Sequence, residues 1–266
     1  MIKLAAISFL AFGRPLGRAF ASSCSPLSYE VKFSLLDSAL KSGQPNSEVV
    51  STFSLKSPPQ ERTWAYFDTN DKGLNAEGWV IRIRHKEGQD VELTYKKRFA
   101  VPDGLDSALA EARDAGFTED AEIDWTTTKQ TLSFDHSVKL SLWTLNGTAI
   151  PSPDWGLYLL VNHIPDKIAD WNHHGWGTDT LKRSRQYGPV TAKVWFGKWN
   201  DIEVRVEVLP LKNANGTGME LTTELSFGAD ASNASALRDE VMHELDSRGW
   251  LNREGKLKTS LVLDRY

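Results

Sequence analysis

The chain has 266 residues, of which 40% are hydrophobic and 25% charged, and its formal net charge is -4 at pH 7. This length and apolar content fit one large domain or a small pair of domains. The acidic balance argues against nucleic acid as the main partner, because no basic excess would attract a phosphate backbone. The single cysteine, Cys24, excludes an intrachain disulfide and a zinc site built from cysteines.

Residues 1–21 have the features of a targeting segment. Lys3 precedes an apolar run at 4–12, and residues 19–21 (Ala-Phe-Ala) have the small-residue pattern of a signal-peptidase site. Arg14 and Arg18 suit a mitochondrial presequence instead, and this alternative stays open. The apolar run is too short to span a bilayer as a stable anchor.

Three Asn-x-Ser/Thr sequons lie in loop-like sequence, at Asn146, Asn215 and Asn233. Chance can supply one or two sequons in a chain of this length. Together with the apolar run near the N-terminus, they favour secretion over a mitochondrial location.

The first predicted strand runs from Leu27 to Leu36. Because side chains alternate along a strand, Ser28, Glu30 and Lys32 share one face. Such a Glu–Lys pair also fits a solvated cross-strand ion pair, which stabilises a sheet only slightly. A second short strand is predicted at 51–55.

A β-hairpin follows, and it carries the most informative side chains. Residues 79–84 alternate and place Arg82 and Arg84 on one face, while residues 91–96 place Lys96 on a face of the partner strand. Guanidiniums two residues apart suit an oxyanion with several oxygens, since each planar fork can bind in a bidentate manner. A solvated face of an ordinary sheet has the same spacing, and on spacing alone that interpretation is favoured.

Apolar residues at helical spacing predict helices at 105–115 and 234–249. Residues 125–145 are expected to form a second hairpin, in which Lys139 can face either side of the sheet. Residues 154–180 are rich in tryptophan and histidine and are interpreted as an elaboration over one mouth of the fold. The adjacent histidines at 173 and 174 would point to opposite faces, so packing is favoured over metal binding.

Charged residues alternate again in three late segments. Residues 181–187, if extended, place Arg183 and Arg185 on one face. Residues 201–208 place Glu203, Arg205 and Glu207 on one face, and residues 219–225 do the same for Glu220, Thr222 and Glu224.

Four segments together resemble one family: YEVK at 29–32, YFDT at 66–69, RIR at 82–84 and ELTYK at 92–96. They are similar to the ExExK, YxDT, RxR and LTxK patterns of the CYTH family, the triphosphate tunnel metalloenzymes. The resemblance implies an α+β fold: a closed antiparallel eight-stranded β-barrel, forming a tunnel, with covering helices. Residues 27–266 would form this single domain.

The resemblance also implies a set of site residues inside the tunnel. Basic side chains would hold a triphosphate, and acidic ones would hold Mg²⁺ or Mn²⁺. The implied phosphate ligands are Arg82, Arg84, Lys96, Arg183 and Arg185. The implied metal ligands are Glu30, Glu207, Glu220 and Glu224. Lys32 and Lys258 would orient the phosphate at the reacting end, with Lys258 in a closing strand at 256–260.

The implied function is metal-dependent hydrolysis of a triphosphate-containing small molecule: inorganic triphosphate, a nucleoside triphosphate or thiamine triphosphate. Ser28 and Thr222 stand where the family pattern has acids. This departure leaves a second hypothesis, a non-catalytic binding protein for phosphorylated small molecules or polyphosphate with a degraded metal site. Both hypotheses require the alternating charges to meet in one wet channel.

Overall fold

The computed structural model describes residues 27–141 and 150–266, so the targeting segment at 1–21 and the sequon at Asn146 lie outside the described residues. The strands are β1 (Ser28–Leu35), β2 (Leu40–Lys41), β3 (Gln44–Pro45), β4 (Gln60–Asp68), β5 (Trp79–Lys86), β6 (Val91–Ala100), β7 (Glu122–Trp125), β8 (Gln130–Leu140), β9 (Arg185–Trp199), β10 (Ile202–Lys212), β11 (Met219–Asp230) and β12 (Leu251–Asn252). The helices are η1 (Asp37–Ala39), α1 (Ser47–Thr52), α2 (Gly73–Ala76), α3 (Leu105–Asp114), α4 (Pro153–Asn162), α5 (Asp166–Ala169), α6 (Trp176–Lys182), α7 (Ala234–Ser247) and α8 (Lys258–Arg265).

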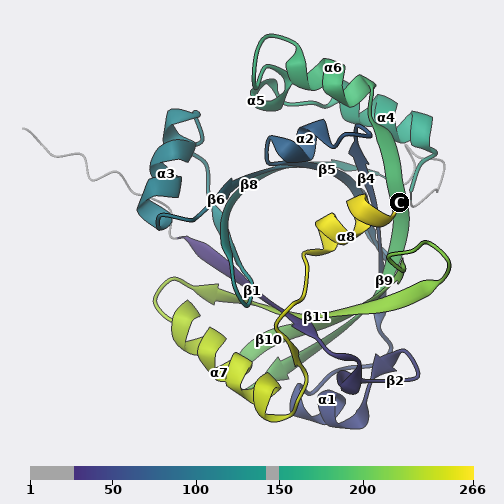
Figure 1. The fold of residues 1–266 in the computed structure, drawn as a ribbon, viewed down its shortest axis with the longest axis vertical. Helices are drawn as coiled ribbons and strands as arrows, with labels where there is room; N and C mark the ends of the chain where they lie inside the picture. The colour runs from purple at the N-terminus through teal and green to yellow at the C-terminus, as the bar shows by residue number, and fades with distance from the viewer. Residues whose placement is uncertain (1–26, 142–149) are drawn as a thin grey trace, which may run out of the picture.

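Within the described ranges, nine strands close into a barrel in the order β11-β10-β9-β4-β5-β6-β8-β7-β1, and β1 pairs with β11 to complete the ring (Figure 1). The predicted closed barrel is confirmed, but the predicted count of eight antiparallel strands is wrong. The short strand β7 is inserted between β8 and β1. Its residues 122–125 pair with residues 28–31 of β1, and the two strands run parallel.

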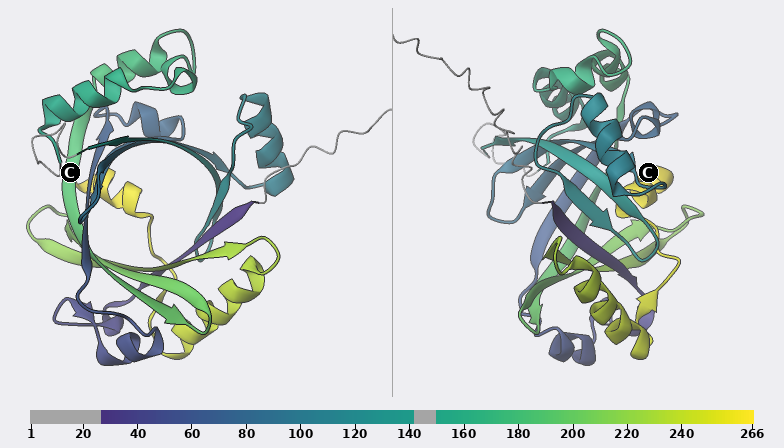
Figure 2. Two further views of the ribbon diagram at one scale, coloured as in Figure 1. Left: turned by 180° about the vertical axis from the view of Figure 1, so that it is seen from behind. Right: turned by 90° about the vertical axis from the view of Figure 1, so that its left-hand side faces the viewer.

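The barrel wall has an apolar outer face and a largely polar inner face, as period-two alternation requires. On β10, Val204 and Val206 point outward into a buried cluster with Val241 and Leu245 of α7. The opposite wall buries its outer face beneath α2–α6, and Figures 1 and 2 show these helices around the outside of the ring. The covering helices therefore stabilise the barrel without filling its interior.

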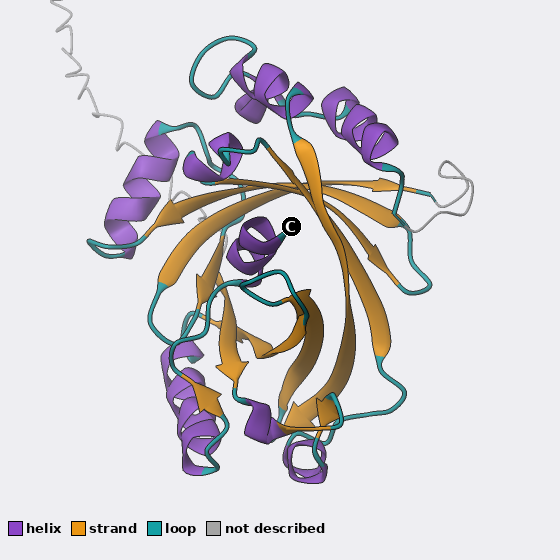
Figure 3. Cartoon of the chain, turned by 45° about the vertical axis from the view of Figure 1, so that its right-hand side comes forward, coloured by secondary structure: helices purple, strands orange, loops and turns teal. Residues whose placement is uncertain are grey.

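Helix α8 lies inside the ring, as Figure 3 shows. Its residues Leu261 and Val262 are buried against the inward-facing side chains of Trp64, Tyr66 and Leu209. The predicted closing strand at 256–260 is wrong, because β11 and β1 already close the ring. The apolar residues of α8 instead pack on one side of the lumen.

Two other local predictions are corrected. Residues 51–55 are not a strand: α1 begins after Asn46, whose side-chain Oδ1 accepts a hydrogen bond from the backbone of Val49 at 2.9 Å. The second hairpin is a single strand, β8, because residues 135–137 remain extended and pair with β6. The helices predicted at 105–115 and 234–249 and the central hairpin are confirmed.

The tryptophan- and histidine-rich segment forms α4, α5 and α6 on the outer wall, not over a mouth of the barrel. Leu160 and Ile168 are fully buried in the cluster outside β4–β6, and Trp171 packs edge-on against Trp79 at 5.7 Å between ring centroids. A β-carbon on Gly177 would collide with the backbone of Ile168, so only glycine allows α5 and α6 this approach. Among the described helices, none is long and apolar enough to cross a membrane.

Candidate functional site

A cavity of about 340 Å³ lies inside the barrel, and charged side chains from most of the strands line it. Eight residues predicted from the sequence meet there: Glu30, Lys32, Arg82, Arg84, Lys96, Glu207, Glu224 and Lys258. Other lining side chains are Arg62, Trp64, Lys86, Arg98, Glu122, Asp135, Val194, Arg205 and Ser226. The alternating charges thus converge on one interior space.

One side of this cavity is a carboxylate cluster. Oxygens of Glu30, Glu122 and Asp124 all lie within 4.8 Å of one another. The ammonium of Lys32 lies between two of them, 2.7 Å from Glu30 and 2.5 Å from Asp124, and Arg205 lies 2.5 Å from Glu30. β1, β7 and β10 therefore contribute to a single charge network.

Burial opposes ionisation in this cluster, but the paired cations outweigh burial. Lys32 and Arg205 lower the pKa of Glu30 from 4.5 to about 2. Burial also opposes the charge on Asp124, yet Lys32 and Lys96 hold its pKa well below its ordinary value. The same contacts raise the pKa of Lys32 despite its burial. These groups are charged at neutral pH.

A second ammonium-bridged pair comes from β10, β11 and α8. Lys258, the first residue of α8, forms an ion pair with Glu207 and lies 4.0 Å from Glu224. Burial raises the pKa of Glu224, although Lys258 and Lys32 oppose this. Lys258 thus points into the cavity from a helix, rather than from the predicted strand.

The facing wall is basic and is only partly neutralised. Arg84 lies 2.5 Å from Glu92. Across the described ranges, Arg62, Arg82 and Lys86 have no carboxylate within 4 Å, and the buried Nε atoms of Arg62 and Arg82 have no hydrogen-bond partner. Burial, with Arg84 and Arg62 nearby, lowers the pKa of Lys86. An anion would relieve this crowding of positive charge.

Lys96 lies between the two walls. Its ammonium is 3.2 Å from Asp124, 3.5 Å from Glu122 and 3.6 Å from Asp135. The side chain is 6% exposed, so this cation is held in place by carboxylates rather than by water. It joins the carboxylate cluster to the basic wall.

Three predicted site residues do not line this cavity. Arg183 is exposed and follows α6, because the segment after Trp176 is helical rather than extended. Arg185 donates a hydrogen bond to Asn70 at 2.8 Å and lies over the ring of Tyr187 at 3.7 Å. Arg183 and Arg185 therefore do not share one phosphate site with Arg82, contrary to the prediction.

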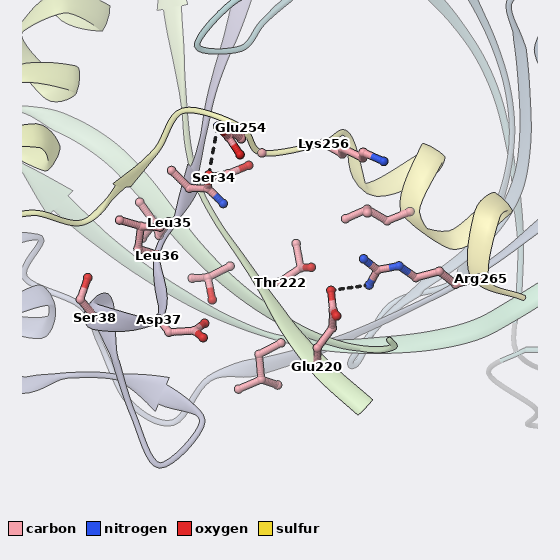
Figure 4. Close-up of a pocket in the computed structure, with 15 residues that line it drawn as sticks. Ser34, Leu35, Leu36, Asp37, Ser38, Glu220, Thr222, Glu254, Lys256 and Arg265 are labelled. Carbon is pink, nitrogen blue, oxygen red and sulfur yellow. Dashed lines mark hydrogen bonds and ion pairs between the residues drawn. The ribbon is translucent and has the colours of Figure 1, made fainter. Parts of the chain in front are cut away.

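Glu220 lies in a second cavity, of about 610 Å³, at the α8 side of the barrel (Figure 4). It lies 2.7 Å from Arg265, and Figure 4 shows this ion pair. Thr222 also lines the second cavity, whereas Glu224 of the same strand lines the first. Residues of α8 line both cavities, Leu261 and Arg265 the second and Lys258 the first, and Glu220 and Glu30 lie in different cavities.

Sequence reasoning missed Arg62, Glu122 and Asp124. The four residues Glu122–Trp125 alternate acid with apolar residue, which is a strand signal too short to stand out. Arg62 belongs to β4, where inward Arg62 and Trp64 alternate with outward Thr63 and Ala65. A search for short alternating segments with few charges could have found the segments of both β4 and β7.

Asp68, in the YFDT segment, has a structural role. Its carboxylate accepts backbone hydrogen bonds from Thr69, Leu74 and Asn75 at 2.8–2.9 Å, so it ties the end of β4 to α2. Burial raises its pKa.

No family model matches the sequence, and no curated protein matches it. The structure is similar to that of HpAC1 from Hippeastrum, an adenylyl cyclase candidate described as having a dominant triphosphatase activity. The TM-score is 0.54 at 13% identity, over 89% of this chain and 99% of that one. A candidate adenylate cyclase from Bacillus halodurans gives a TM-score of 0.53 at 13% identity, over 88% and 96%.

The chain has a divergent CYTH fold. The CYTH resemblance of the sequence is thereby confirmed at the level of fold. At this identity the likeness extends to architecture alone, and the chemistry has to be argued from the cavity itself.

Proposed function

We propose that this CYTH-fold protein is a metal-dependent phosphohydrolase that binds a triphosphate chain in the central cavity. The proposal rests on one observation: the two facing walls of the cavity carry opposite charges. Arginine and lysine side chains of β4 and β5, of which only Arg84 has a carboxylate within 4 Å among the described residues, face the carboxylate cluster of β1 and β7. A polyanion with bound divalent cations suits both walls. The basic wall then contacts the anion, and the carboxylate cluster contacts the cations.

The basic wall would bind the phosphate oxygens. Arg82 and Arg84 point into the cavity from alternate positions of β5, and Arg62 joins them from β4. Their guanidiniums can hold non-bridging oxygens in a bidentate manner. Lys96 and Lys32, which lie at the carboxylate cluster, would hold the phosphate at the reacting end.

The carboxylate cluster fits a hard divalent cation. Mg²⁺ and Mn²⁺ prefer oxygen ligands, and Glu30, Glu122 and Asp124 bring three carboxylates together. Such an ion, when bound, would neutralise charge on the phosphate oxygens and position an attacking water. Glu207 and Glu224 are not part of this cluster and contact Lys258, so we assign them to orienting that lysine.

The test is phosphate release from tripolyphosphate at alkaline pH with Mg²⁺ or Mn²⁺, with EDTA as the blank. Nucleoside and thiamine triphosphates are compared in the same assay. We expect release that EDTA abolishes, and loss of release in Asp124→Asn. No release from any of these compounds with either metal would reject hydrolysis.

The second candidate function is binding without hydrolysis. One observation favours it: Lys32 already bridges Glu30 and Asp124, so an ammonium lies where a metal ion would compete. Ser28 and Thr222 add no carboxylate to the cavity. Calorimetry separates the two functions, because tripolyphosphate binding that persists in excess EDTA, without turnover, favours the binding protein.

A further inference from the structure

A separate cavity lies outside the barrel wall, next to the start of helix α5; we call it the outer cavity. Figure 1 shows α3 and α5, which border it, on the outside of the ring. Its volume is about 270 Å³, just below the ~300–1,000 Å³ typical of sites for drug-sized molecules, so it suits a ligand with few heavy atoms. Among the described lining residues, it shares only Asp135 with the central cavity.

The buried part of its lining is aromatic. Three of its rings come from β5, β6 and β8, where alternation turns them away from the lumen. A fourth ring, Phe117, follows the end of α3. Gly116 has a φ of +82° there, and the backbone N–H of Phe117 donates to the carbonyl of Ala112 at 2.9 Å, which turns the chain back onto the wall. The four rings, each at most 6% exposed, are those of Trp79, Tyr95, Phe117 and Phe134.

The aromatic cluster around this cavity already binds two ammonium groups of the protein itself. Nζ of Lys97 lies 4.1 Å from the ring centroid of Trp171 and 4.8 Å from that of Phe99. Nζ of Lys167 lies 4.5 Å from the ring centroid of Phe117. The face of an aromatic ring attracts a cation electrostatically, and the attraction is stronger where water is excluded. Rings of this cluster therefore accept substituted ammonium groups.

The exposed rim of the outer cavity is acidic. Glu119, Asp135 and Asp166 line it, and Lys167 is the only lysine or arginine among its described lining residues. Lys167 forms an ion pair with Glu119, and Asp135 lies 3.6 Å from Lys96. Asp166, in the first turn of α5, has no lysine or arginine within 4 Å in the part of the chain that the structure describes. The charge left unpaired at the rim is negative, which favours a cationic ligand over an anionic one.

We propose that the outer cavity binds a small organic cation, with its substituted ammonium group against the aromatic rings and Asp166 as its counter-charge at the rim. Alkyl groups on the nitrogen suit this site, because they bury apolar area on the rings while the charge gains the cation–π attraction. The inference goes beyond the proposed phosphohydrolase and does not depend on it, since the outer cavity contains neither the basic wall nor the carboxylate cluster of the central one.

Calorimetry with choline as the probe tests the inference. The neutral comparison is the dimethylbutanol in which a carbon atom replaces the charged nitrogen of choline. We expect choline to bind at least about tenfold more tightly than this alcohol. Phe117→Leu, which keeps an apolar side chain but removes the ring, should weaken choline binding about tenfold.

A second variant tests the rim without disturbing the core. Asp166→Asn should weaken choline binding about three- to fivefold and leave binding of the alcohol unchanged. The matched control is Asp154→Asn, which removes an exposed carboxylate from the first turn of the neighbouring helix α4 and should change neither affinity. Near-UV circular dichroism checks that each variant is folded.

Equal affinities for choline and the alcohol would overturn the inference, as would equal effects of Asp166→Asn and Asp154→Asn. Absence of choline binding at millimolar concentrations would also overturn it. Vesicles of phosphatidylcholine carry the same ammonium group on a lipid. Co-sedimentation that Asp166→Asn abolishes, without binding of free choline, would assign the cavity to a membrane surface instead. Failure of the proposed hydrolysis is distinguishable, because choline binding requires neither metal nor phosphate.

Discussion

Replacing Glu30 with glutamine tests how strongly the charge network stabilises the barrel. The Glu30 side chain is 21% exposed and lies between Lys32 and Arg205. One pKa unit corresponds to ~1.4 kcal/mol, so lowering the pKa of Glu30 from 4.5 to about 2 stabilises the fold by about 3 kcal/mol at neutral pH. Because the folded-state pKa is depressed, this stability is complete above pH 4.5 and is lost as the pH falls towards 2.

The assay is urea-induced unfolding of wild type and Glu30→Gln at a series of pH values from 7 downwards. At pH 7 we expect the free energy of unfolding of the variant to be lower by about 3 kcal/mol. The difference should shrink below pH 4.5. Glu203→Gln, which changes an exposed carboxylate of the same barrel, should have little effect. A Glu30→Gln difference that stays constant with pH, or is absent at pH 7, would refute the reasoning.

Four further predictions concern other residues of the barrel and one exposed sequon. Arg82→Gln should weaken tripolyphosphate binding about 10- to 100-fold by calorimetry, since a charge-assisted hydrogen bond is worth about 1.5–3 kcal/mol; an unchanged affinity would remove Arg82 from the site. Lys258→Met should slow phosphate release, because Glu207 and Glu224 lose their bridging ammonium, and unchanged kinetics would contradict this role. Leu261→Ala should lower the free energy of unfolding by about 2–4 kcal/mol in urea titrations, since α8 packs inside the barrel. For protein made through a secretory pathway, endoglycosidase treatment should increase gel mobility, since Asn215 is exposed; no shift would count against secretion.

Much of the barrel wall was predictable because each strand has two different environments. On β10, Val204 and Val206 enter the outer core while Arg205 and Glu207 enter the cavity, so the alternation is strict and visible. The same holds for Arg82 and Arg84 on β5. Where a segment lacked this contrast, prediction failed. Residues 135–137 look like a turn, and only pairing with β6 keeps them extended.

The candidate site was predictable in part. Alternation along one strand placed Glu30 and Lys32 on the same face, and the family resemblance implied that this face lines the site. Their partner Asp124 is 92 residues from Lys32 and lies on a four-residue strand, so no local pattern connects them. Glu220 was assigned to the site by the family resemblance, and it shares a strand face with Glu224. The structure places the two in different cavities.

The sequence by itself determined which side chains alternate and where the strands with clear alternation begin, such as β1, β5, β6, β10 and β11, but a solvated outer face fitted the same spacing of charges. Tertiary structure alone decided which of these charges meet. Ring closure by β11 and β1 turns the polar faces of separate strands towards one another, and the position of α8 selects which part of that interior remains a cavity. The physical reason is that an alternating strand has the same local energetics whether its polar face meets bulk water or an enclosed, charged lumen. Contacts between distant strands distinguish the two.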